Sequence, residues 1–272
     1  ASDPGSGVII HNDAQHFSAG VDLNHFRSLI ENSEWPEMDE FLGDFQKVVS
    51  KLNNLPVPVI GAPSGLAIGG GFEVLAHCDA LVAHTNSTFG LVEAGVGLLP
   101  AGGGVKQTYL RWFNKTQDWD EAAWQCWMQI GYGKIGTSPD MSAHYCYFLP
   151  DRDRQVMNKD RIFEQACALN LNMQKPYSSP EIPTIRLANP NMREKMHVFM
   201  ENGVSQGMFT PHNLTTAMAI ADVIVAKEGE SQSVTEQDVL ARERANFIKL
   251  AKTPQTLSRI SSLLDSGSAE QN

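Results

Sequence analysis

The hydrophobic pattern of the first third of the chain predicts short strands alternating with amphipathic helices. Residues 7–10 ("GVII") and 57–62 ("VPVIGA") are short apolar runs bounded by turn residues, which is typical of buried strands. A short helix is expected over residues 20–31. A longer one is expected over residues 37–55, because its apolar residues fall on one helical face. These residues are Phe41, Phe45, Val48, Val49 and Leu52.

Glycines interrupt the pattern after the second strand. A turn at residues 63–65 leads through three consecutive glycines into a predicted helix over residues 71–78. The apolar run "DALVA" (79–83) follows and predicts another strand. The order of strand, glycine-rich turn, helix and strand is typical of an α/β layer fold.

Beyond residue 112 the pattern becomes mainly helical. Thr235 and Asp238 form a capping-box signature, and Thr253 followed by Pro254 marks another helix start. Four prolines between residues 174 and 192 predict a loop. We therefore expect an α/β core over residues 1–112 and a helical region over residues 113–272. The helices expected in that region are 120–131, 158–173, 213–227, 234–252 and 253–267.

Composition narrows the class of protein. The net charge is −10 and the chain has no basic run, so we expect no nucleic-acid partner. No apolar stretch reaches about 18 residues, so we expect no membrane span. Four cysteines without a C-x-x-C pair indicate reduced thiols, and a location in the cytoplasm or an organelle matrix. A zinc site of Cys126, His144, Cys146 and Cys167 fits no ligand spacing, so no metal is expected.

The glycines at 69–71 stand where a helix is expected to begin. The first turn of a helix carries unpaired N–H groups, and glycine lets another molecule approach them closely. The segment could therefore hold a carbonyl oxygen that becomes negative during a reaction, with Glu73 beside it. The alternative is that the glycines only permit tight packing of helix against strand, and that Glu73 is a favourable acid in the first helical turn.

Two further segments have a similar character. Glu93 lies among glycines and apolar residues, with Lys106 as the next basic residue. An acid in apolar surroundings has a raised pKa, and two such acids can divide the roles of acid and base. Glu93 could instead cap a helix or accept backbone N–H groups in a tight loop. In "HFSAGVDL" (16–23), small residues precede a helix, offering an N–H group near Val21, with Asp22 as a first-turn residue.

Three segments, taken in order, resemble the motifs of the crotonase (enoyl-CoA hydratase/isomerase) superfamily. They are "FSAGVDL" (17–23), "GLAIGGGFEVLAHCDALVA" (65–83) and "FGLVEAGVGLLPAGGG" (89–104). The resemblance implies a spiral of ββα units, with an acyl-CoA thioester as substrate and no cofactor. It implies an oxyanion hole formed by the N–H groups of Val21 and Gly70, and catalytic glutamates Glu73 and Glu93. Ala19, Gly20, Asp22 and Gly69 would then contact the substrate.

The implied activity is the hydration of trans-2-enoyl-CoA to 3-hydroxyacyl-CoA in fatty-acid β-oxidation. The alternatives are a Δ3–Δ2 enoyl-CoA isomerase and a non-catalytic acyl-CoA-binding module. The flanking segments resemble the hydratase part of proteins that also contain a 3-hydroxyacyl-CoA dehydrogenase, although no G-x-G-x-x-G fingerprint is present. We therefore expect a fused or associated dehydrogenase domain or a homo-oligomer, and an α/β core that lacks its first strands.

Other residues invite a chemical role but have ordinary structural explanations. His77 could act as a base, and His16 could line the channel for CoA, but a packed helix histidine is the simpler reading of His77. The tryptophans at 112, 119, 124 and 127 could surround an acyl pocket, yet aromatic residues at helical spacing usually form a core. Arg27, Lys106 and Arg111 are the candidates for binding the CoA phosphate.

Overall fold

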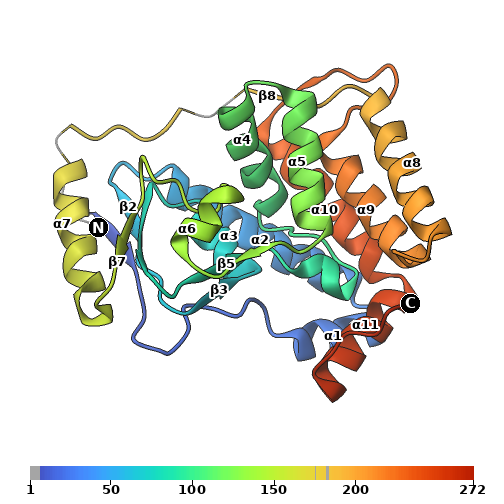
Figure 1. Cartoon of the computed structure of the whole chain (residues 1–272), viewed down its shortest axis with the longest axis horizontal. Helices are drawn as coiled ribbons and strands as arrows, with labels where there is room; N and C mark the ends of the chain where they lie inside the picture. Colours follow the sequence, from blue (N-terminus) through green and yellow to red (C-terminus); the bar gives the residue numbers. More distant parts are fainter. Residues whose placement is uncertain (1–6, 175, 182–183) are drawn as a thin grey trace. The chain divides into compact units, whose positions relative to one another are not determined.

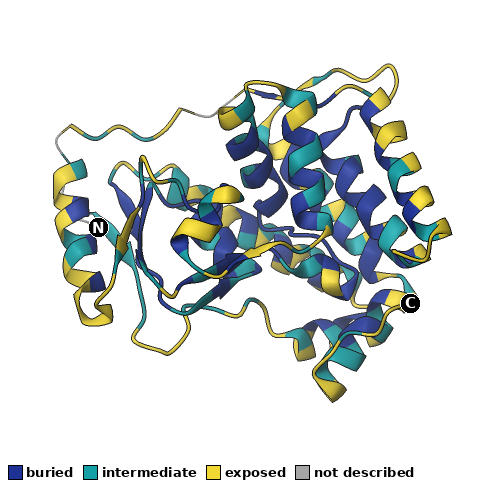
Figure 2. Cartoon of the chain, in the orientation of Figure 1, coloured by how far each residue is buried: buried dark blue, intermediate teal, exposed yellow. Residues whose placement is uncertain are grey.

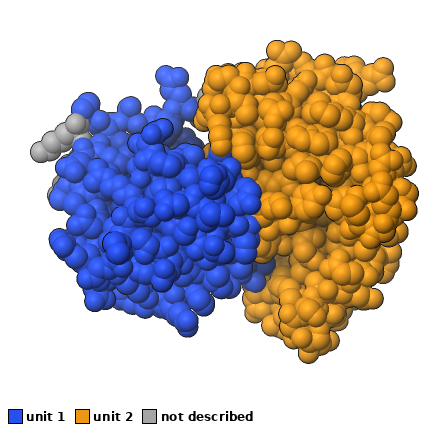
Figure 3. Space-filling model, in the orientation of Figure 1, with its two compact units in different colours: residues 1–21, 47–90, 135–182 blue, residues 22–46, 91–134, 183–272 orange. Residues whose placement is uncertain are grey.

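The structure is a computed structural model, and it describes residues 7–174, 176–181 and 184–272 (Figure 1). The chain divides into two compact units, each made of separate stretches of sequence (Figure 3). Unit 1 comprises residues 1–21, 47–90 and 135–182, and unit 2 comprises residues 22–46, 91–134 and 183–272. These units do not coincide with the expected division at residue 112, which stays a prediction.

Unit 1 is built on two sheets. Its strands are β1 (Val8–Ile10), β2 (Val59–Gly61), β3 (Leu66–Ile68), β4 (Ala80–His84), β5 (Thr88–Gly90), β6 (Ile135–Gly136) and β7 (Arg154–Val156). The first sheet has the order β1-β2-β4-β7 and is parallel throughout. The second has the order β3-β5-β6, with β3 parallel to β5 and β6 antiparallel. From β2 to β5 the chain alternates between the sheets, which is the spiral that the resemblance predicts.

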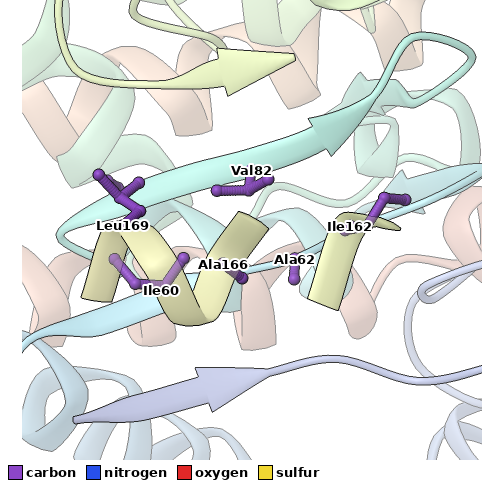
Figure 4. Packing of buried hydrophobic residues seen from close by; sticks show 7 residues of the cluster. Ile60, Ala62, Val82, Ile162, Ala166 and Leu169 are labelled. Carbon is purple, nitrogen blue, oxygen red and sulfur yellow. The ribbon is translucent and has the colours of Figure 1, made fainter. Parts of the chain in front are cut away.

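Helix α7 (Ile162–Met173) covers the parallel sheet of unit 1. Its residues Ile162, Ala166 and Leu169 recur at intervals of four and three, so they share one face. They pack on Ile60 and Ala62 of the β2 segment and on Ala80 and Val82 of β4 (Figure 4). Burial of these side chains away from water stabilises the parallel four-stranded sheet. Unit 1 also contains α3 (Gly70–Ala76), α6 (Pro139–His144) and the short 3-10 helix η2 (Lys159–Arg161).

Unit 2 is mainly helical, and its helices bury their apolar faces against one another (Figure 2). Helix α9 is the most buried of them and packs against α5, α8 and α10. Its small residues Ala217, Ala219 and Ala221 permit this close packing. The elements are α1 (Leu23–Glu31), the 3-10 helix η1 (Glu93–Val96), α4 (Gly104–Thr116), α5 (Trp119–Gly131), α8 (Asn191–Ser205), α9 (Pro211–Ile224), α10 (Glu236–Ala251), α11 (Pro254–Ser266) and the strand pair β8 (Ile185–Arg186) and β9 (Ser233–Val234). Helix α2 (Trp35–Asn53) contributes residues to both units.

Most of the expected elements are confirmed. The strands expected at 7–10 and 57–62 contain β1 and β2, and the capping box at Thr235 and Asp238 opens α10. The helix expected over 158–173 is wrong at its start, because Asn158 caps the 3-10 helix η2 and the α-helix begins at Ile162. The loop expected over 174–192 includes β8 and the first residues of α8, while residues 175 and 182–183 lie outside the described residues.

Candidate active site

The turn before α3 explains two of the three consecutive glycines. Gly69 has a φ of 55° with a ψ of −134°, a conformation in which only glycine is free of strain. Gly71 lies directly against Ser18, since a Cβ atom on Gly71 would be 2.5 Å from Cβ and 2.7 Å from Oγ of Ser18. The start of the helix can therefore approach the 17–20 segment only because residue 71 has no side chain.

The 17–20 segment runs beside strand β3 through Ser18. The N–H group of Ser18 donates to Leu66 O at 2.9 Å, and Ser18 O accepts from the N–H group of Ile68 at 3.1 Å. The hydroxyl oxygen of Ser18 accepts from the N–H group of Gly20 at 3.1 Å, which shapes the turn that follows. Sequence reasoning missed Ser18, although it lies within the "FSAGVDL" motif.

Two backbone N–H groups remain available where these segments meet. A Cβ atom on Gly20 would lie 3.8 Å from the nitrogen of Gly70 and 3.9 Å from Cα of Gly69, so the two backbones are close neighbours. Gly69 uses its own N–H group to bond Gly90 O at 2.9 Å. In the described part of the chain, the N–H groups of Gly70 and Val21 donate to no protein acceptor. Gly70 and the exposed Val21 can therefore offer these donors to a ligand oxygen.

Glu73 belongs to the first turn of α3, and its side chain is buried. Its N–H group donates to Gly69 O at 3.1 Å, so its position on the helix is tied to the glycine turn. His77 follows one turn later, is fully buried, and has its Nδ1 atom 2.7 Å from Glu73 O. The ring of His77 is therefore a packed part of the helix, as the simpler reading predicted.

Asp22 lies just outside the helix in which it was expected. It is the N-cap residue of α1, and its carboxylate accepts from the N–H group of Asn24 at 2.9 Å. This hydrogen bond lowers the pKa of Asp22. The cap explains why an aspartate stands at this position, while its role in substrate binding stays a prediction. Ala19, three residues earlier, is exposed.

Glu93 is the first residue of η1 in unit 2. The turn is closed by the N–H group of Leu98, which donates to Glu93 O at 3.0 Å, and by that of Gly97, which donates to Ala94 O at 3.1 Å. Glu93 is partly exposed as a residue, but its Oε2 atom is shielded from solvent. Because Glu73 belongs to unit 1, the pairing of the two glutamates stays a prediction.

The second glycine cluster has an internal partner. At the start of α4, the N–H group of Gly103 donates to Oε2 of Glu243 and that of Lys106 donates to Oε1, each at 2.7 Å. Glu243 lies on α10 and is fully buried. A carboxylate of the protein thus occupies the N-terminus of α4. The sequence carried no signal of this contact, because Glu243 is 140 residues from Gly103.

The other candidate residues have partners or buried positions within the protein, and their roles toward CoA stay predictions. Lys106 is buried and pairs with Glu236, and Arg27 pairs with Asp265 at 3.0 Å. Arg111 is also buried. His16 accepts from the N–H group of Leu66 at 3.2 Å and so supports the turn before β3.

The tryptophans belong to the helical core of unit 2. Trp119 stacks on Phe113 with ring centroids 3.6 Å apart, and the indole N–H group of Trp112 donates to Gln129 at 2.7 Å. The cavity beside Trp127 has about 30 Å³, which is room for roughly one or two water molecules.

The described residues contain no group of three or more His, Cys, Asp or Glu side chains arranged to hold a metal ion. Cys126, one of the four residues considered for zinc, is fully buried, and burial raises the pKa of its thiol. None of the described helices has the length and apolar character needed to cross a membrane.

Comparison with known proteins supports the resemblance to enoyl-CoA hydratases and isomerases. Residues 2–116 match the enoyl-CoA hydratase/isomerase family. The chain is 26% identical over 278 residues to a protein of Bacillus subtilis (strain 168) named "Probable 3-hydroxyacyl-CoA dehydrogenase", covering 98% of this chain and 34% of that protein. It is 40% identical over 91 residues to the mitochondrial methylglutaconyl-CoA hydratase of Mus musculus, covering 34% of this chain and 28% of that protein.

Solved structures show the same fold. The crystal structure of an enoyl-CoA hydratase from Rhodobacter sphaeroides matches with a TM-score of 0.62 at 16% identity, covering 95% of this chain and 76% of that one. The predicted crotonase-like α/β fold is thereby confirmed. The predicted resemblance to the enoyl-CoA hydratase/isomerase family is confirmed as well, since the matching segment contains all three motifs. The chain spans about a third of the length of the Bacillus relative.

Proposed function

We propose that this chain hydrates a trans-2-enoyl-CoA to a 3-hydroxyacyl-CoA, a step of fatty-acid β-oxidation. The observation that carries the proposal is the meeting of Gly20 and Val21 with Gly69 and Gly70, where two N–H groups are left for a ligand oxygen. Such a pair can stabilise the negative charge that develops on a thioester oxygen. The N–H group of Glu73 donates to the carbonyl oxygen of Gly69, so Glu73 is tied to the same glycine turn.

The proposed reaction adds a hydroxyl group to Cβ and a hydrogen to Cα of the substrate. The oxygen of the water attacks Cβ while Glu73 accepts one of its protons, and Glu93 delivers a proton to Cα. The thioester oxygen carries the negative charge of the intermediate, held by Val21 and Gly70. The proton that Glu73 takes from the water then passes through solvent to Glu93, which restores the starting protonation state of both glutamates.

The proposal extends to the substrate contacts and the partners. Gly20 and Gly69 would let the thioester approach the backbone closely, beside Ala19. Hydration leaves the overall oxidation level unchanged, so the reaction requires no electron carrier, and we propose that no cofactor takes part. The name of the Bacillus relative and its threefold length support a fused or associated dehydrogenase domain, which would oxidise the 3-hydroxyacyl product.

The test is the loss of the conjugated-thioester absorbance when the protein is mixed with crotonyl-CoA. We expect Glu73→Gln and Glu93→Gln each to lower kcat at least about 100-fold, which is typical of losing a positioned acid or base. Glu40→Gln, at an exposed position on α2, is the matched control and should behave as wild type. Wild-type rates in both variants would refute the two-glutamate mechanism.

Isotope labelling separates the proposal from its alternatives. In water enriched in oxygen-18, a hydratase places one labelled oxygen on Cβ of the product. Conversion of a 3-enoyl-CoA without label uptake would instead identify an isomerase. Binding of acyl-CoA with no turnover of either substrate would identify a binding module.

A further inference from the structure

The turn that carries Glu93 is held at its far end by a buried hydroxyl group. Gly97 closes the turn with a φ of 78°, and its carbonyl oxygen accepts from Oγ1 of Thr256 at 3.0 Å. Thr256 lies in the first turn of α11 and is fully buried. Gly97 is four residues from Glu93, and the Leu98-to-Glu93 hydrogen bond ties the two ends of the turn together.

A buried histidine stands behind the hydroxyl group. The Nε2 atom of His212, on α9, is 3.0 Å from Oγ1 of Thr256. A Cβ atom on Gly97 would lie only 2.6 Å from Nε2 of His212 and 2.8 Å from Oγ1 of Thr256. Residue 97 must therefore be glycine both for its conformation and for its contact with this pair. All three residues belong to unit 2.

The protons in this arrangement can be assigned by counting. A carbonyl oxygen only accepts, so the single hydroxyl proton of Thr256 goes to Gly97 O. The Nε2 atom of His212 must then donate to Thr256, which fixes the Nε2–H tautomer of the neutral ring. Burial, and to a smaller extent the positive charge of Arg259 on α11, lower the pKa of His212 to about 4. The ring is thus neutral at pH 7.

We propose that His212 and Thr256 are positioning residues that hold the Glu93 turn in place through the carbonyl oxygen of Gly97. This inference rests on the proposed role of Glu93 as the proton donor to Cα. A proton donor must be aligned with the carbon that receives its proton, and a displacement of about 1 Å can lower a rate by about 100-fold. The hydrogen bonds run from α9 through α11 to the turn.

The first experiment replaces the hydroxyl group while keeping the shape of the side chain. We expect Thr256→Val to lower kcat for crotonyl-CoA by about 10-fold to 100-fold, with KM changed less than about twofold, because only alignment is lost. Thr256→Ser keeps the hydroxyl group and should restore kcat. An unchanged kcat in Thr256→Val, in a variant that is folded by circular dichroism, would overturn the proposal.

A double variant separates positioning of Glu93 from general structural damage. If Thr256 acts through Glu93, then Thr256→Val should have no further effect in a Glu93→Gln background. The same fold-loss in both backgrounds would overturn the proposal. His212→Gln, which keeps an N–H donor, should retain more activity than His212→Leu. Equal activity in the two His212 variants would count against the proposal as well.

Nitrogen-15 NMR of the histidine ring tests the hydrogen-bond chain separately from the proposed function. We expect the Nε2–H tautomer of His212 at pH 7 in the wild-type protein. In Thr256→Val, the nitrogen-15 chemical shift of Nε2 should change, because the hydrogen bond to Oγ1 is lost. The Nδ1–H tautomer would overturn the hydrogen-bond chain itself. Inactivity of the wild-type protein towards crotonyl-CoA, with the Nε2–H tautomer present, would overturn the proposed function and with it the catalytic role of the positioning, while the hydrogen-bond chain itself would stand.

Discussion

Replacing Gly71 by alanine tests the contact on which the proposed oxyanion hole depends. The new Cβ atom would lie 2.5 Å from Cβ of Ser18, and ordinary contacts between such atoms begin near 3.4 Å. The 17–20 segment and the start of α3 must therefore separate by about 0.9 Å. Ser18 is bonded to both Gly20 and Ile68, so this separation moves the N–H group of Val21 away from that of Gly70.

The expected effects on stability and on rate differ in size. Overpacking of this kind costs about 1–3 kcal/mol, and the better helix propensity of alanine offsets about 1 kcal/mol. The net loss of unfolding free energy should therefore be about 2 kcal/mol or less. A displacement near 1 Å between oxyanion donors should lower kcat/KM about 100-fold, which is the size of effect seen on losing one such donor.

The assay pairs crotonyl-CoA kinetics with urea unfolding of the same preparations. Gly131→Ala is the matched control, because Gly131 also lies in a helix and no heavy atom lies within 4 Å of its added Cβ atom. It should leave kcat/KM unchanged. Adding Ser18→Gly to Gly71→Ala removes the two closest contacts and should restore part of the lost stability. Wild-type kcat/KM in Gly71→Ala would refute the reasoning that places the oxyanion hole between these segments.

Two further predictions concern buried groups of unit 2. Glu243→Ala should lower the unfolding free energy by about 2–5 kcal/mol, because it leaves two buried N–H groups at the start of α4 without their acceptor. Glu243→Gln should lower the unfolding free energy less. Equal urea midpoints for all three proteins would contradict this prediction. The pKa of His212 is 6.5 in an unfolded chain and about 4 in the folded one, so the unfolded state binds more protons between these values. The contribution of neutral His212 to the unfolding free energy is fully present above pH 6.5 and falls by roughly 3 kcal/mol as the pH drops to 4. His212→Gln should remove this part of the pH dependence. The same pH profile of unfolding free energy in both proteins would argue against it.

Local sequence signals predicted several helix starts and short buried strands. The helix starts at Thr235 and Thr253 follow from capping residues within a single turn, and the strands β1 and β2 follow from short apolar runs. Strand β7 gave no such signal, because it is polar and largely exposed and, among the described strands, lies at the edge of its sheet beside β4. Helix α8 has methionines at 192, 196 and 200 that share a buried face, so its pattern was present but was not used.

Long-range contacts account for most of the site features that the sequence did not predict. Val21, Gly70, Glu73 and Glu93 could be singled out from glycine patterns and from the family resemblance. Thr256, in contrast, bonds a carbonyl group 159 residues away, and no local pattern marks a hydroxyl group for such a contact. Asp22 was placed within a helix because acids favour the first turn, and its capping position lies only one residue earlier.

The division of the chain into units made of separate stretches has a consequence for how the protein folds. The chain passes between units after residues 21, 46, 90, 134 and 182, so neither unit is complete until much of the other has been synthesised. Strand β7, the partner of β4, is synthesised about 70 residues after β4, and Thr256 follows the Glu93 turn by an even longer stretch of chain. Pairings so distant in sequence form slowly. Unpaired strand edges are therefore exposed during synthesis, which favours association with chaperones before the helices of the C-terminal end are made.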